Sequence, residues 1–175
     1  MGRKWKPRLS EAGSARPFVV AAFDDLEAFF QVRRELEKQF GSIEYEADSI
    51  TGNVPDSLYE PVARRLCRIV SFARPIGRDE IVDVRRRTIQ IESKRQYQGR
   101  PLVELDPGYV AEFSVVRTAL SEDFHRIYMY GGIFAETLYY FERLAFRPYP
   151  YTPEFFRHRD VIAAFNDIRL IHVSG

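Results

Sequence analysis

The sequence contains little of what builds disulfide frameworks or metal sites. Cys67 is the only cysteine among 175 residues, so the chain cannot form an internal disulfide or a site with several thiolates. The three histidines lie far apart in the sequence, and no His-Glu-x-x-His or Cys-x-x-Cys motif occurs. We therefore predict no metal and no cofactor, and a single thiol fits the reducing cytoplasm.

Long apolar runs and an excess of one charge are also missing. No stretch approaches the roughly 18 apolar residues of a membrane span, and the first residues lack the apolar run of a signal peptide. Lys and Arg number 26 against 25 Asp and Glu, which gives a net charge of +1. This balance disfavours a membrane surface or a nucleic acid as a general partner.

Glycine-rich phosphate loops are absent too. The sequence has neither Gly-x-x-x-x-Gly-Lys-Ser/Thr nor Gly-x-Gly-x-x-Gly, so P-loop and dinucleotide-binding folds have no support.

The composition that is present predicts one folded domain with a short arm. Hydrophobic residues make up 45% of the chain and charged residues 29%, which is typical of globular proteins. Residues 1–16 carry five basic side chains and one acidic side chain, and we predict a flexible basic arm there. The arm is either a solvated tail or a weak electrostatic contact to RNA or another acidic partner. Residues 17–175 form the predicted single α+β domain.

Hydrophobic periodicity predicts a β-α-β-β-α-β order in the first two thirds of the domain. The predicted elements are strand 18–23, helix 26–40, strand 43–47, strand 66–72, helix 78–94 and strand 102–105. This order fits a ferredoxin-like core. Residues 48–63 have the composition of a loop, and the spacing of the apolar residues in 109–120 favours a helix over a strand.

The last third of the chain has the clearest local signal. Gly131-Gly132 separates two segments rich in aromatic and β-branched residues, 125–130 and 133–141, and predicts a tight β-hairpin. A final helix is expected over 153–170. The predicted fold class is α+β, with a mixed, largely antiparallel sheet flanked by about three helices and a C-terminal β-hairpin and helix added to the core.

The hairpin register predicts a buried polar pair. With Gly131 and Gly132 as the turn, Ile127 faces Glu136, and His125 and Glu136 become diagonal neighbours on an otherwise apolar face. A buried carboxylate needs a partner, and the imidazole would supply one. The pair is either structural or a general acid or base.

The opposite hairpin face and the preceding turn supply further polar groups. Arg126 lies between tyrosines, among them Tyr128, and an arginine in that setting can hold a phosphate or carboxylate and stack on a ring. Leu105 to Tyr109 reads as a tight turn, because proline and glycine take its central positions. Asp106 either caps this turn or presents a carboxylate beside the hairpin.

Three motifs together resemble a known family. They are Leu105-Asp106-Pro107-Gly108-Tyr109, Ser121-Glu122-Asp123-Phe124-His125-Arg126-Ile127-Tyr128 and Gly132-Ile133-Phe134-Ala135-Glu136-Thr137. In residues and spacing they are similar to the bacterial and archaeal family known as domain of unknown function 4416 (DUF4416), and the resemblance runs from about Phe18 to the end. The sequence departs from the family at Ile89, where members more often carry Asn, and near Tyr149, where they carry Trp. The resemblance implies no established activity.

Two functions remain open from the sequence, and whether the protein is an enzyme is not decided. The first is binding of a small anionic ligand, such as a nucleotide or a phosphorylated metabolite, near residues 106–136. Its candidate ligand-binding residues are Asp106, Tyr109, His125, Arg126, Tyr128 and Glu136. The second is a non-enzymatic interaction or scaffold protein whose tyrosine-rich face and aromatic final helix, with Phe155, Phe156 and Phe165, pack against a partner or a second copy.

Overall fold

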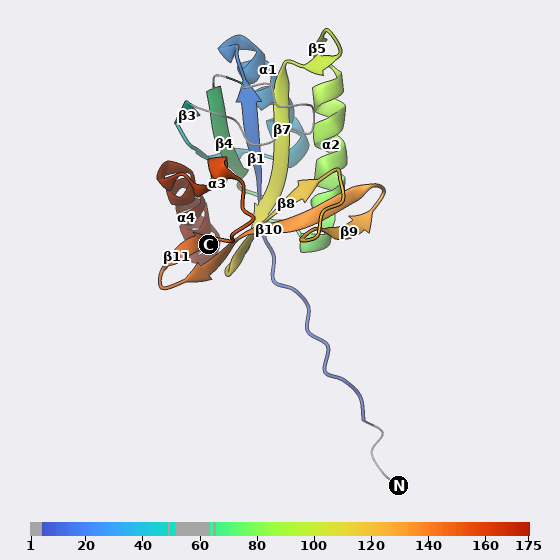
Figure 1. Ribbon diagram of the computed structural model, residues 1–175, viewed down its shortest axis with the longest axis vertical. Coiled ribbons are helices and arrows are strands. Elements are labelled where there is room, and N and C mark those ends of the chain that lie inside the picture. Colours follow the sequence, from blue (N-terminus) through green and yellow to red (C-terminus); the bar gives the residue numbers. More distant parts are fainter. Residues whose placement is uncertain (1–4, 49, 52–63, 65) are drawn as a thin grey trace.

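The computed structural model describes residues 5–48, 50–51, 64 and 66–175. The predicted loop at 48–63 falls almost wholly outside these residues. Figure 1 shows one large twisted sheet with helices on both faces and an amino-terminal segment that runs away from the body.

Nine strands form the large sheet within the described residues, and all of their pairings are antiparallel. They are β1 (Arg16–Phe23), β2 (Ile43–Glu46), β3 (Ile50–Thr51), β4 (Leu66–Phe72), β7 (Val103–Val110), β8 (Ser114–Ala119), β9 (Ile127–Tyr130), β10 (Ile133–Glu142) and β11 (Ala145–Pro148). The order is β11-β10-β8-β7-β1-β4-β2, with β3 on β4 and β9 on β10. A separate short pair joins β5 (Gln96–Tyr97) to β6 (Arg100–Pro101).

The helices lie on both sides of this sheet. They are α1 (Leu26–Phe40), a 3-10 turn η1 (Arg78–Glu80), α2 (Ile81–Ser93), α3 (Glu154–Arg157) and α4 (Arg159–Ser174). The strands β7-β1-β4-β2, with α1 and α2 between them in the chain, have the ferredoxin-like order that the sequence predicts. The α+β class is confirmed, and β8, β10, β11 and β9 extend this core beyond β7. No helix among the described residues is long and apolar enough to cross a membrane.

Local signals explain where α1 begins and ends. Asp25 is its N-cap, and its carboxylate accepts from the backbone N–H groups of Glu27 and Ala28. Gly41 ends the helix at φ 95°, a conformation that favours glycine. Between these ends, Phe29, Leu36 and other apolar residues recur on the buried face.

The central strand β1 is buried on both faces, and this explains why its sequence is a continuous apolar run and not an alternating one. Val19, Ala21 and Phe23 pack under α1 and α2 in one core. Phe18 and Val20 pack against α3 and α4 in a second core, on the opposite face.

The aromatic residues of the last helices lie inside this second core. Phe156 and Phe165 are fully buried and Phe155 is nearly so. Phe165 meets the ring of Phe18 edge-on at 4.8 Å between centroids. These side chains therefore cover the protein's own sheet, and they are not the exposed partner surface that the scaffold interpretation needs.

The helix expected over 109–120 is wrong, and so is the turn at Leu105–Tyr109. Both segments belong to β7 and β8, which pair from Gly108 to Val110. Pro107 lies within β7 opposite Val19 of β1, and its carbonyl accepts from the Thr118 hydroxyl at 3.0 Å. The apolar residues of 109–120 have helical spacing, but the segment is also rich in β-branched residues. These fit a sheet that is buried on both faces, and this packing decides the structure.

The final helix is interrupted where the sequence predicts one continuous helix. His158 has extended backbone angles, φ −61° and ψ 136°, and separates α3 from α4, which runs on to Ser174.

Candidate functional site

The predicted hairpin forms, but its register differs by one residue beyond the turn. Gly131 (φ 62°) and Gly132 (φ 79°) make the turn, and Tyr130 pairs with Ile133. A bulge then places Ile127 opposite Ala135, where the sequence-based register has Glu136. Ile127 is 71% exposed, so the apolar face expected of this hairpin is not a core face.

His125 nevertheless reaches Glu136. The histidine precedes β9 instead of lying in it, and its Nε2 is hydrogen-bonded to Glu136 Oε2. The predicted contact between His125 and Glu136 is therefore confirmed, although His125 lies before β9 and not within the hairpin.

Glu136 lies at the centre of a cluster of charged side chains, and the sequence reasoning missed one of them. Arg117 of β8 faces Glu136 across the strands, and its Nε donates to Glu136 Oε1. Arg117 Nη1 donates to Asp106 of β7 at 3.1 Å, and Arg126 Nε donates to Glu136 Oε2 at 3.2 Å. We call Asp106, Arg117, His125, Arg126 and Glu136 the charged cluster.

The two carboxylates of the charged cluster have opposite pKa shifts. Burial alone would raise the pKa of the Glu136 carboxyl, but Arg117 and Arg126 outweigh burial and hold that pKa below its ordinary value. Burial raises the pKa of the Asp106 carboxyl, and the nearby charges of Arg117 and Arg85 offset only part of this effect. Glu136 is therefore the firmly ionised member of the pair.

The ring of His125 is held between aromatic side chains. It stacks on Tyr151 at 4.1 Å between centroids, with 22° between the planes, and Phe124 meets it edge-on. The Tyr151 hydroxyl donates to the carbonyl of Thr137 at 3.0 Å, which fixes this ring over β10. Of the two ring nitrogens, only Nε2 has a hydrogen-bond partner in the described part of the chain, and Nδ1 is buried without one.

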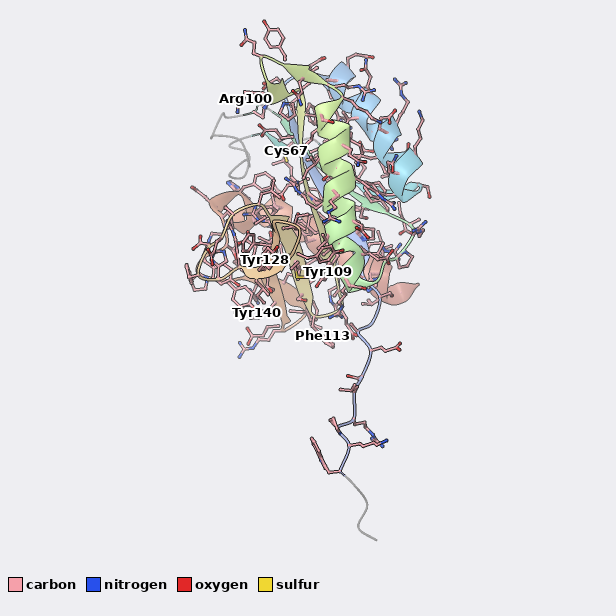
Figure 2. The ribbon with its side chains drawn as sticks, turned by 90° about the vertical axis from the view of Figure 1, so that its right-hand side faces the viewer. Cys67, Arg100, Tyr109, Phe113, Tyr128 and Tyr140 are labelled. Atoms are coloured by element: carbon pink, nitrogen blue, oxygen red, sulfur yellow. The ribbon has the colours of Figure 1, made fainter. Side chains whose placement is uncertain are left out.

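A cavity of about 200 Å³ opens beside this histidine. Its polar lining residues are Arg78, Tyr109, His125, Glu136 and Thr137, and its apolar ones are Ile81, Val116, Ile127, Met129 and Ala135. In Figure 2, Tyr109 lies beside the lower end of α2, which is the amino-terminal end of that helix. Burial raises the pKa of the Tyr109 hydroxyl, and Arg78 counteracts this effect in part.

Five of the six residues predicted from the sequence lie in this neighbourhood. Tyr109, His125 and Glu136 line the cavity, and Asp106 and Arg126 belong to the adjoining charged cluster. Tyr128 does not join them. It is 57% exposed, and its hydroxyl accepts from the Gly132 N–H at 3.4 Å, so it closes over its own turn.

The structure adds Arg117 and Arg78, which the sequence analysis did not single out. Arg117 interrupts the apolar segment Val115 to Leu120, and a cation inside a strand-like run indicates a buried ion pair. That signal was hidden by the helical interpretation of the segment. Across the described ranges, no group of three or more His, Cys, Asp or Glu side chains is placed to hold a metal ion.

One family model matches nearly the whole chain. The family is described as Domain of unknown function (DUF4416), and the match covers residues 14–172. Neither a curated protein nor a solved structure matches the chain significantly. The chain therefore belongs to the DUF4416 family.

Proposed function

We propose that this member of the DUF4416 family binds a small anionic ligand in the cavity between the start of α2 and the β9–β10 hairpin. The observation that carries the proposal is the convergence of Arg78, Tyr109, His125 and Glu136 on one cavity with apolar walls. Ligand sites commonly combine apolar walls with a few polar groups that fix orientation.

The charge balance around the cavity supports an anion. Glu136 already has Arg117 and Arg126 as partners. Arg78 has no ion pair within the described part of the chain, and its Nε donates only to the carbonyl of Gly13, at 3.1 Å. A carboxylate or phosphate in the cavity would therefore meet an uncompensated guanidinium.

The volume supports a small ligand. Drug-sized ligand pockets usually span about 300 to 1,000 Å³. A cavity of about 200 Å³ suits a short carboxylate or a small phosphorylated metabolite better than a whole nucleotide. We place this binding activity in the cytoplasm, because Cys67 is the only cysteine.

The proposal is tested by thermal unfolding with inorganic phosphate, acetate, benzoate and small phosphorylated metabolites. A ligand at about 100 times its dissociation constant adds about 2.7 kcal/mol, which raises the midpoint by about 5 to 10 °C for a domain of this size. Arg78→Gln and Tyr109→Phe should reduce this shift, because each removes one polar group from the cavity. The matched controls are Arg86→Gln and Tyr97→Phe, whose side chains are exposed and do not line the cavity. A flat panel, or a full shift in Arg78→Gln, would contradict the proposal.

A second function is favoured by one observation on β9. This strand pairs only with β10 among the described elements, and Ile127, Tyr128 and Tyr130 on it are substantially exposed. An apolar strand at a sheet edge can pair with another chain. We propose as the alternative a homo-oligomer joined through β9. Sedimentation of the wild type and of Ile127→Lys tests it, since a stable oligomer should dissociate in the variant. A wild type that sediments as a monomer contradicts it.

A further inference from the structure

We propose that the ligand of this cavity is a monocarboxylate with a short apolar tail, and that Arg78 and Tyr109 bind its carboxylate while the tail lies against the apolar walls. The inference rests on the proposed function and deepens it, because it names the class of anion and the way in which the protein orients it. It sets this class apart from phosphates and from dicarboxylates.

The first step is that Arg78 and Tyr109 have accessible hydrogen-bond donors without partners. Nε of Arg78 donates to the carbonyl of Gly13, but the two terminal nitrogens of its guanidinium donate to no group in the described part of the chain. The Tyr109 hydroxyl has no partner there either. None of these three atoms is buried without a partner, so they are open to solvent, and both residues line the cavity.

The second step is that these donors lie close to one another. Burial raises the pKa of the Tyr109 hydroxyl, and the charge of Arg78 opposes this rise. The guanidinium therefore lies near the hydroxyl, and the hydroxyl keeps its proton at neutral pH. A guanidinium and a phenol O–H that lie together can donate to the two oxygens of one carboxylate.

The third step concerns the number of charges. Arg78 is the only arginine or lysine in the lining within the described residues. The charged cluster meets the cavity at Glu136, and its two carboxylates and two guanidinium groups are paired with one another. A ligand with a single negative charge therefore matches the cavity, since a second charge would find no further arginine or lysine.

The fourth step is that the walls beside these donors are apolar. Tyr109 of β7 lies directly opposite Val116 of β8, and Val116 lies directly opposite Thr137 of β10, so the three side chains share one face of the sheet. Ala135 is two positions from Thr137 and shares this face. A tail that starts at Tyr109 therefore runs over Val116 and Ala135. The apolar lining residues are Ile81, Val116, Ile127, Met129 and Ala135.

Inorganic phosphate is the principal rival ligand. Its further oxygens need more donors than Arg78 and Tyr109 supply. Among the other described side chains of the lining, Nε2 of His125 is bonded to Glu136, and the Thr137 hydroxyl is neutral. Phosphate oxygens would therefore face apolar side chains without hydrogen bonds, which costs affinity. A carboxylate has two oxygens, and its tail needs no donor.

A series of ligands tests the inference on the wild type. NMR titration at pH 7.5 measures the affinity for acetate, butyrate and hexanoate, which should rise about fourfold for each methylene that the walls cover. Succinate is the matched comparison for butyrate, because a second carboxylate replaces the terminal methyl group. It should bind at least tenfold more weakly. Benzoate should shift the methyl signals of Val116 and Met129, and benzyl alcohol should bind at least tenfold more weakly than benzoate.

Two variants separate the binding of the carboxylate from the binding of the tail. Arg78→Gln should weaken acetate, butyrate and hexanoate by the same factor, because it acts on the shared carboxylate. Val116→Thr keeps the shape of the side chain and puts a hydroxyl on the wall, so it should weaken butyrate and hexanoate severalfold and leave acetate unchanged. Val173→Thr is the matched control, because Val173 is exposed on α4 and does not line the cavity.

The outcomes separate this inference from the proposed function. Equal affinity for acetate, butyrate and hexanoate would overturn the inference and leave the proposed function standing. Phosphate or succinate that binds more tightly than butyrate would have the same meaning. Benzyl alcohol that binds as tightly as benzoate would remove both, since the negative charge would then play no part. No binding of any of these compounds would also remove both.

Discussion

One arginine side chain, Arg117, pairs with both carboxylates of the charged cluster. Arg117 is 4% exposed and lies between Asp106 and Glu136, and its guanidinium is also 5.2 Å from the ring centroid of Phe156. Without this cation, the buried Glu136 carboxylate and the partly buried Asp106 carboxylate would each face a desolvation cost that Arg117 now offsets. The positions of His125 and Arg126 then follow from Glu136, so Arg117 organises the charged cluster without lining the cavity itself.

Glu92 of α2 is a buried carboxylate whose pairing is incomplete, and it predicts a pH-dependent stability. Its Oε1 accepts from the Leu105 N–H at 2.7 Å, and burial raises its pKa to about 7, against the opposing effects of Arg85 and of this hydrogen bond. Because the pKa of Glu92 is higher in the folded protein than its ordinary value of 4.5, folding favours the protonated carboxyl. The stability that the protonated Glu92 contributes is therefore full below pH 4.5 and is lost as the pH rises through about 7. Glu92→Gln should gain stability relative to the wild type between pH 5 and pH 8, on the order of 3 kcal/mol.

Urea denaturation at both pH values measures this change. The amide of Glu92→Gln also changes the free energy of unfolding by an amount that does not depend on pH. This amount cancels, because only the difference between pH 5 and pH 8 is compared. Glu142→Gln, at an exposed position, is the control and should show no such gain. Parallel pH profiles of Glu92→Gln and the wild type would contradict the prediction.

Among the elements, β7 joins the ferredoxin-like core to the added hairpins. It pairs with β1 along its whole length and with β8 from Gly108 onward. Gly108 has no room for a side chain, since an added Cβ would be 2.2 Å from the Val116 carbonyl oxygen and 2.5 Å from Cζ of Phe18. The glycine of the Asp-Pro-Gly motif therefore serves close packing of strands and not a turn.

Gly108→Ala should lower the free energy of unfolding by about 2 to 3 kcal/mol, because the new methyl group meets a backbone carbonyl oxygen and the fully buried ring of Phe18, and neither can move away cheaply. Denaturant unfolding measures the loss. Gly13→Ala is the matched control, since its Cβ would meet nothing within 4 Å. Equal stability of Gly108→Ala and the wild type would show that β7 and β1 can move apart at this point.

For the whole molecule, the folded body begins near residue 14. The family match begins there, and Arg16, expected as part of the arm, is buried in β1 and donates to Glu44 and to the carbonyls of Phe72 and Ala73. Residues 5–14 are exposed and lead away from the body (Figure 1), whereas Ala15 is buried and forms a β-bridge with Ile76.

Removing residues 2–12 should therefore leave the free energy of unfolding unchanged within about 0.5 kcal/mol, the usual range for changes away from buried features. The same truncation tests the RNA contact considered for the basic arm. If that contact exists, RNA binding by the full chain should weaken steeply with salt, and the truncated protein should lose it. A truncation that destabilises the fold would mean that the arm packs on the body.

The sequence by itself determined the elements whose signals are local. The Asp25 cap and Gly41 delimit α1, and Gly131-Gly132 makes the hairpin turn. The period of the apolar residues placed β1, β4 and α2, and the family motifs contain Asp106, His125 and Glu136 of the charged cluster. These features depend on residues a few positions apart, so they can be read along the chain.

Only the tertiary structure decided which distant side chains meet. The bulge before Phe134, the passage of Pro107 through a sheet, the bridge from Arg117 to two carboxylates and the cavity shared by Arg78 and Tyr109 all depend on which strands are neighbours and in what register. A shift of one residue turns a side chain to the other face of a sheet, and no local pattern reports that shift. The contact between His125 and Glu136 is a further example, because His125 lies before β9 and not in it. A buried carboxylate is stable only with a partner, and which histidine atom could reach it depended on the tertiary structure.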